Sequence, residues 1–426
     1  MKSFLLVALA ATCACAQADE ERFGVHGQST WIWQRKPAMS AAYSGPNSLA
    51  ADSEKSYSFT ATAALGVRPW AGAEAYFDAE LVQGVALSGL TGLGALTNGE
   101  LQKTAGSNPL LYRARAYLRQ SWALGDETEA VESGFNQLGG AQATRRLVLT
   151  AGNLAVSDLF DNNRFAHDAR TQFLNWGLLT HGPFDFAADS RGYSQGAALE
   201  YFDAGWALRG GRFMVPRESN GLALDTRLSQ VHGDQVELER HHTLDGQAGT
   251  LRLLAFRNVA VMAAFDEALA SPALQLADVR RRQAKTGWGV ALEQDLSPTL
   301  GGFLRAGRHD GRTEPYSFAA IDNAVSAGLV WRGSPWQRDD NALGLAWASQ
   351  GLSASHRRFL AAGGVDFFLG DGRLNYGREQ VLEAFYSAAL DARLKVSLDL
   401  QQISHPAYNR DRGPATALAL RLHAEL

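Results

Sequence analysis

The last twelve residues of the chain, 415–426 (ATALALRLHAEL), alternate between two kinds of side chain. Leu418, Leu420 and Leu422 share one face, and Arg421 and His423 share the other. A period of two is that of a β-strand, because successive side chains point to opposite sides. Residues 416–426, tilted by about 45°, rise roughly 26 Å, which matches the apolar band of an outer-membrane barrel. A strand of a β-sandwich alternates in the same way, so the rest of the chain must decide.

The same alternation recurs along the whole chain, in segments separated by Gly, Pro, Asp and Asn. We count about sixteen such segments from Phe23 onward, with no linker or change of composition between them. A large soluble sheet would also contain continuous apolar runs for strands that are buried on both faces, and few are present. The sequence therefore predicts an all-β protein, a transmembrane antiparallel β-barrel of about 16 strands with inward-folded loops. Clear examples of the alternation are 58–67, 73–81, 112–122, 288–296, 325–332 and 394–401.

The first 18 residues have the parts of a secretory signal peptide, with Lys2 before an apolar stretch at 4–11 and small residues at 14–16. We expect cleavage before Gln17 or Asp19, and we assign 1–18 to the signal and 19–426 to the barrel. A lipid anchor on Cys13 is a weaker alternative. Both cysteines lie in this segment, so the mature chain offers neither disulfides nor thiolate ligands. Export together with an alternating barrel predicts the cell outer membrane.

Three connections are longer than a hairpin needs: 84–110, 155–183 and 259–286. The lumen of a barrel this wide stays open unless loops fold into it. The best candidate is the 155–183 insert, because it combines planar polar side chains with aromatic rings. Sugar hydroxyls need oriented donors and acceptors, and sugar C–H faces need aromatic surface. An ordinary outer loop would have the same composition. The residues that we expect to contact solute there are Arg164, His167, Asp168, Arg170, Gln172 and Trp176.

Charged side chains on two successive segments form a second candidate site. Three acidic residues share one face of 73–81, and three arginines share one face of 112–122. If the two strands are neighbours, the charges make a cross-strand ladder, which either stiffens the wall or filters solute. These residues are Glu74, Asp78 and Glu80 on the first segment and Arg113, Arg115 and Arg119 on the second.

Other functional classes find little support in the sequence. The pair His241-His242 has no thiolate or carboxylate at ligand spacing, and no nucleophile-elbow, zinc-protease or phosphate-loop motif is present. We therefore expect no catalytic activity, no metal and no cofactor, and keep an outer-membrane barrel hydrolase as a minor alternative. The net charge of −4 gives no basic footprint for nucleic acid. The 34 arginines against six lysines keep a general or anion-preferring porin open.

Several short motifs together resemble the carbohydrate-selective porin (OprB) family. They are 160–176 (FDNNRFAHDARTQFLNW), 191–201 (RGYSQGAALEY), 210–221 (GGRFMVPRESNG), 233–239 (GDQVELE), 367–378 (FFLGDGRLNYGR), 379–390 (EQVLEAFYSAAL) and 409–414 (NRDRGP), with the closing RLHAEL. The resemblance implies a barrel that passes monosaccharides and small saccharides by diffusion. The expected partners are small sugars, outer-membrane lipid and the barrel assembly machinery, and the chain is a monomer or a homotrimer. The chain departs from the family pattern at Leu426, where Phe is favoured, and at Ala169, where Pro is expected.

Overall fold

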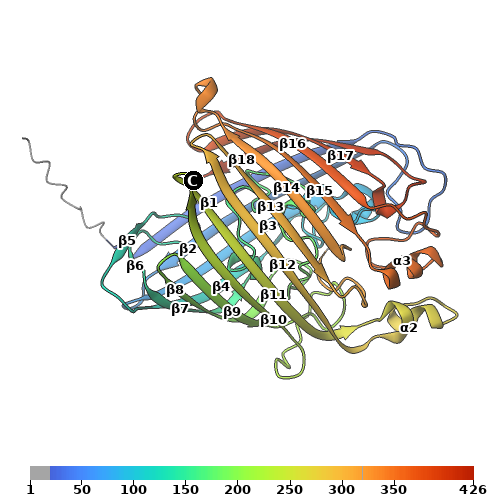
Figure 1. The fold of residues 1–426 in the computed structure, drawn as a ribbon, viewed down its shortest axis with the longest axis horizontal. Helices are drawn as coiled ribbons and strands as arrows, with labels where there is room; N and C mark the ends of the chain where they lie inside the picture. Colours follow the sequence, from blue (N-terminus) through green and yellow to red (C-terminus); the bar gives the residue numbers. More distant parts are fainter. Residues whose placement is uncertain (1–19, 319) are drawn as a thin grey trace, which may run out of the picture.

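The computed structural model describes residues 20–318 and 320–426, so the predicted signal peptide lies outside the described residues. Sixteen strands form one closed antiparallel barrel, and β1 pairs with β18 to complete it (Figure 1). The predicted fold and strand number are confirmed. The strands are β1 (Phe23–Lys36), β2 (Glu54–Val67), β3 (Ala73–Val85), β4 (Leu110–Ala123), β7 (Arg146–Leu154), β8 (Ser194–Asp203), β9 (Trp206–Phe213), β10 (His232–Leu244), β11 (Gln247–Met262), β12 (Arg281–Ser297), β13 (Leu300–His309), β14 (Asn323–Arg332), β15 (Ala342–Gly351), β16 (Glu379–Ala389), β17 (Leu394–Ser404) and β18 (Ala415–Glu425).

The closing strand has the two faces that its alternation predicts. Leu418 and Leu422 are 42% and 39% exposed on the outside, whereas Arg421 and His423 are buried in the lumen. Leu426 extends the pairing, because its backbone exchanges two hydrogen bonds with Gly27 of β1. Closure satisfies the backbone groups at both edges, which an open sheet in lipid would leave unpaired.

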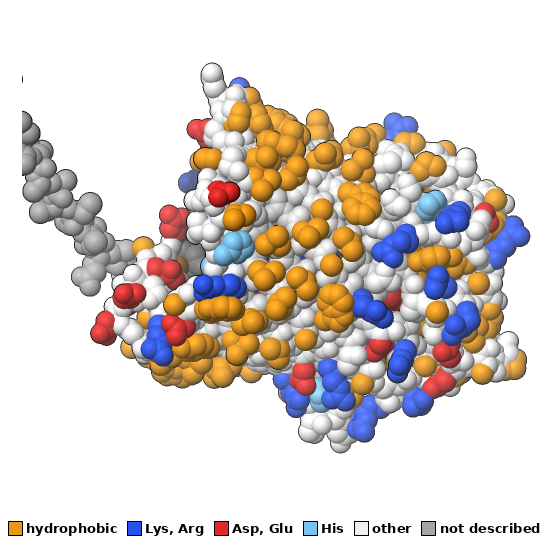
Figure 2. All heavy atoms as spheres, viewed as in Figure 1, with side chains coloured by type: hydrophobic (Ala, Val, Ile, Leu, Met, Phe, Trp, Pro, Cys, Tyr) orange, Lys and Arg blue, Asp and Glu red, His pale blue; other side chains and the backbone are white. Residues whose placement is uncertain are grey.

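The outer surface and the two ends of the barrel differ in character. Hydrophobic side chains cover the strands, and Lys and Arg gather toward the end that carries the long loops (Figure 2). That end also carries the helices α2 (Phe265–Ala270) and α3 (Ala354–Ala361), as Figure 1 shows. Connections at the opposite end are short, as at 204–205 and 245–246. Short turns face the periplasm in outer-membrane barrels, and longer loops face outward.

One connection at the short-turn end is longer. The chain between β4 and β7 forms a hairpin of β5 (Thr128–Val131) and β6 (Gly140–Ala143), which is a two-stranded sheet separate from the barrel. The segment 132–139 at its tip turns back toward the barrel. Leu138 is 2% exposed, and its backbone N–H donates to the Tyr76 hydroxyl at 3.1 Å. This segment therefore closes part of the lumen from the short-turn end.

None of the helices in the described residues is both long enough and apolar enough to cross a membrane.

The expectation that Arg113 lies in the lumen is wrong. The β3–β4 register shifts by one residue, so that Arg115 pairs with Asp78 while Arg113 pairs with Ala79. Such a β-bulge inserts one extra residue and thereby exchanges the faces of the strand on its two sides. Ala79 follows Phe77, which is 44% exposed, by two positions and shares its outer face. Arg113 is therefore exposed on the outside of the barrel.

Candidate functional site

The 155–183 insert crosses the lumen and is held there by carboxylates of the opposite wall. Glu237 on β10 accepts a hydrogen bond from the backbone N–H of Asp161 at 2.8 Å. Glu293 on β12 accepts one from the N–H of Arg164 at 2.7 Å. Glu383 on β16 accepts one from the N–H of Asn175 at 2.9 Å. Backbone groups far from water must find partners, and here the wall provides them.

Inward arginines hold the backbone carbonyls of the same insert. Arg305 on β13 donates to the carbonyls of Leu178 at 2.7 Å and Ala166 at 2.8 Å. Arg421 on β18 donates to the carbonyl of Gln172 at 2.8 Å and also to that of Ala169. Five strands thus grip the insert, and its predicted inward folding is confirmed.

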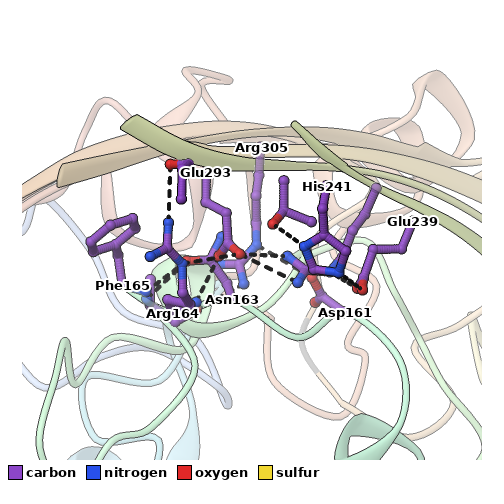
Figure 3. A network of polar contacts seen from close by, with 12 residues as sticks. Asp161, Asn163, Arg164, Phe165, Glu239, His241, Glu293 and Arg305 are labelled. Atoms are coloured by element: carbon purple, nitrogen blue, oxygen red, sulfur yellow. Dashed lines mark hydrogen bonds and ion pairs between the residues drawn. The ribbon is translucent and has the colours of Figure 1, made fainter. Parts of the chain in front are cut away.

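The wall residues beneath the insert also pair with one another (Figure 3). The Arg305 Nε atom lies 3.3 Å from Asp161 of the insert. Arg252 of β11 bridges Glu239 at 2.6 Å and Glu293 at 3.3 Å. Because these buried cations have carboxylate partners, this side of the lumen fixes the insert and leaves little unpaired charge for solute.

A cavity of about 650 Å³ remains on the other side of the insert. It lies between the insert, the connection from β3 to β4, and the inner face of those two strands. The segment 132–139 also lines it, through Phe135, Asn136 and Gln137. Asn136 donates a hydrogen bond to Asp78 on β3 at 2.9 Å, so the segment is fixed to the wall.

Charged pairs form one side of this cavity. Arg170 of the insert lies 2.8 Å from Glu100 and 3.5 Å from Glu80. Arg115 lies 2.7 Å from Asp158 and 3.1 Å from Asp78. Burial raises the pKa of Glu100, and Arg170 opposes this shift by favouring the charged carboxylate.

Another part of the cavity lining is aromatic. The ring of Trp176, the first residue of the short helix α1 (Trp176–Leu179), stacks on Phe318 with centroids 5.0 Å apart and an angle of 10° between the planes. Phe186 extends this surface, with its ring centroid 4.0 Å from that of Phe318. A solute in the cavity can therefore meet both oriented polar groups and aromatic surface.

The cross-strand ladder is present in two of its three expected steps. The strands β3 and β4 are neighbours, and Asp78 pairs with Arg115 while Glu74 lies 3.5 Å from Arg119. Glu80 instead accepts a hydrogen bond from Tyr112, which the bulge turns inward, and pairs with Arg170 of the insert. The ladder thus belongs to the barrel wall, and at Glu80 it connects to the 155–183 insert.

Six of the eleven expected pathway residues line the cavity: Glu80, Arg115, His167, Asp168, Arg170 and Trp176. Arg164 does not, because it reaches the far wall and pairs with Asp295 at 3.0 Å. The Gln172 side chain accepts hydrogen bonds from the backbone of His167 and Asp168 and so shapes the insert. Glu74 and Asp78 stay within the ladder, and Arg113 faces outward.

Several cavity residues were missed by sequence reasoning, among them Lys103, Arg191, Phe318 and the segment 132–139. The connection 84–110 was expected to hold a packed insert, yet no motif marked Lys103 as a pore residue. For the segment 132–139, no signal in the sequence showed that it returns to the lumen. In the described part of the chain, no three His, Cys, Asp or Glu side chains gather as a metal site.

Comparisons with known proteins agree with this architecture. The model of the carbohydrate-selective porin, OprB family, matches residues 50–426. The chain is similar to Pseudomonas putida OprB in its high-pH structure, with 15% identity and a TM-score of 0.73 over 95% of this chain and 94% of that one. The low-pH structure gives 12% identity and a TM-score of 0.51, over 95% and 93% of the two chains. The outer membrane channel DcaP of Acinetobacter baumannii gives 9% and 0.52, over 95% and 97%. At these identities the likeness shows the fold alone. No curated protein matches the sequence.

Proposed function

The chain belongs to the OprB family of carbohydrate-selective porins and is an outer-membrane carbohydrate porin, and from its geometry we propose the route that sugars take through it. A monosaccharide enters the cavity of about 650 Å³ with one ring face on Trp176 and Phe318. Its hydroxyl groups turn toward Glu80, Arg115 and Arg170, which line the same cavity.

The observation that carries this route is that charged and aromatic side chains line one cavity. Aromatic rings cover the C–H face of a sugar, while charged groups with fixed geometry bond to its hydroxyls. A sugar that diffuses through a water-filled pore must bind weakly enough to leave again, so each contact contributes only about 1 kcal/mol net to its binding. The solute then leaves unchanged by diffusion, with no catalytic step. Small sugars, lipid and the barrel assembly machinery are the proposed partners.

Glucose block of the ion current through purified protein in a planar bilayer tests the route. We expect Trp176→Leu to raise the glucose concentration for half-block several-fold while the channel still conducts. Leucine keeps an apolar side chain there but removes the flat ring. Arg393→Gln, in an exposed turn, is the control and should leave the block unchanged. Equal block by Trp176→Leu, Arg170→Gln and the wild-type protein would show that sugar takes another path.

The hydrolase alternative has its own test. Turnover of ester or lipid substrates by the folded barrel would establish a catalytic function, and we expect none above the rate in buffer.

A further inference from the structure

The cavity is lined by five Lys or Arg side chains, and they fall into two groups. Three of them have carboxylate partners: Arg115 with Asp158 and Asp78, Arg119 with Glu74, and Arg170 with Glu80 and Glu100. The other two are Lys103 and Arg191. Within residues 20–318 and 320–426, neither forms an ion pair with any Asp or Glu.

Arg191 lies in the loop before β8 with an unused guanidinium group. It stacks on the ring of Tyr112 at 4.7 Å from the centroid, and its buried Nε atom has no hydrogen-bond partner among the described residues. The nearby Asp189 carboxylate forms no ion pair with the Arg191 side chain among the described residues, and its Oδ1 atom accepts hydrogen bonds from the backbone N–H groups of Arg191 and Tyr193. Burial raises the pKa of Asp189, and the charges of Arg191 and Lys103 both oppose that shift. A guanidinium held by stacking retains its planar fork of donors for a ligand.

Lys103 comes from the connection between β3 and β4. Its ammonium group donates to Asn220 at 2.6 Å and to the carbonyl of Ser317, and lies 5.1 Å from the ring centroid of Phe318. Burial lowers its pKa to about 7. The carboxylates of Asp185 and Asp189 oppose this shift, but neither forms an ion pair with Lys103 among the described residues, and Asp185 pairs with Lys285 at 2.7 Å.

Both cations line the cavity, and the Asp189 carboxylate acts electrostatically on each of them, which places them in one corner of it. Arg191 stacks on Tyr112, and the hydroxyl group of Tyr112 is bonded to Gln102, the residue before Lys103. The aromatic surface of Phe318 adjoins Lys103 as well. The remaining cavity carboxylate without an ion pair, Asp168, is occupied by Thr171 and by the backbone N–H of Arg170.

We infer that this corner binds the acidic group of an anionic sugar, so that the pore prefers uronates or sugar phosphates to neutral sugars of the same size. The inference rests on the proposed function, since the sugar ring takes the same place against Trp176 and Phe318. A carboxylate or phosphate accepts two parallel hydrogen bonds from a guanidinium and draws a third from the ammonium. The ligand thus supplies the direct ion pair that each of these half-buried cations lacks.

The experiment compares half-block concentrations of glucose, glucuronate, glucose 6-phosphate and acetate in planar bilayers at low salt, using the folded full chain. We expect at least one acidic sugar to block at a several-fold lower concentration than glucose, and more strongly than acetate. A preference for glucuronate alone identifies the carboxylate, and a preference for the phosphate alone identifies the phosphate. The gap between the half-block concentrations of glucose and the acidic sugar should narrow at high salt, because screening weakens charge attraction.

Variants assign the effect to the two cations. Lys103→Gln and Arg191→Gln should each narrow the gap between acidic and neutral sugar several-fold, and the double variant should abolish it. Lys103→Arg retains the charge and should retain most of the gap, which separates loss of charge from a misfolded loop. Arg393→Gln is again the control.

Two results would overturn the inference. In the first, glucose and both acidic sugars block the wild-type pore equally, or acetate matches the acidic sugars. In the second, the double variant keeps the preference. Failure of the proposed route looks different, because glucose block would then be insensitive to Trp176→Leu whatever the acidic sugars do.

Discussion

Replacing Arg170 by Gln should shift the ion preference of the pore toward cations. Glutamine keeps the polar character and approximate length of the side chain but removes its charge. Arg170 now lies 2.8 Å from Glu100 and 3.5 Å from Glu80, whose side chains are only 11% and 2% exposed. In the variant, both carboxylates face the cavity without their cation.

The size of the shift follows from the charge removed. A unit charge 4 Å from a passing ion changes its energy by about 1 kcal/mol in water. Salt at about 0.1 M, with a Debye length near 10 Å, reduces this to roughly 0.7 kcal/mol. Cations gain what anions lose, so the permeability ratio changes by up to about tenfold. Burial already raises the pKa of Glu100, and losing Arg170 raises it further. A higher pKa favours the protonated, uncharged form of Glu100, so the effect of the variant should grow as the pH rises.

Reversal potentials across a KCl gradient in planar bilayers measure the ratio directly. We expect Arg170→Gln to change the cation-to-anion permeability ratio several-fold at neutral pH. The change should be larger at alkaline pH and smaller in concentrated salt. Arg393→Gln removes the same charge at the surface and should change nothing. If Arg170→Gln leaves the reversal potential at the wild-type value under all three conditions, the ion path does not pass Arg170, and the cavity is not the pore.

Three further predictions concern the faces, the short-turn end and the outer loops. Leu420→Arg should block insertion, because an arginine facing lipid at mid-depth costs roughly 2–4 kcal/mol. Arg421→Leu should insert and alter only the pore. The mobility of unheated protein on a gel reports insertion of both variants, and equal insertion would refute the assigned faces. Asn136→Ala removes the bond to Asp78 and should raise single-channel conductance, and an unchanged value would mean that the segment 132–139 does not limit flow. His356 of α3 is buried, which disfavours its charge, but Asp322 and Asp366 raise its pKa to about 9 from 6.5, so its stabilising effect is complete below pH 6.5 and is lost as the pH rises through 9. Hydrogen exchange of 352–371 should show that loss, and His356→Gln should abolish the pH dependence.

The sequence by itself determined the class of fold and the faces of most strands. The alternation at 415–426 placed Leu418 and Leu422 outside and Arg421 inside, and the structure agrees. Such a pattern is readable because lipid and lumen impose opposite demands on neighbouring side chains within a single strand. Antiparallel hairpins also pair strands in chain order, so the sequence alone predicts the ladder between β3 and β4.

Only the tertiary structure decided where the inserts lie and which charges remain unpaired. The residues that hold the 155–183 insert, such as Glu237, Glu293 and Glu383, come from strands far apart in the sequence. One inserted residue in β4 places Arg113 on the outside of the barrel. The alternation of side chains along the sequence does not reveal such a bulge, because the bulge depends on pairing with the neighbouring strand. Whether an arginine is a structural tie or a free cation depends on the carboxylates that other strands bring within about 4 Å of it, and that distance is set by closure of the barrel.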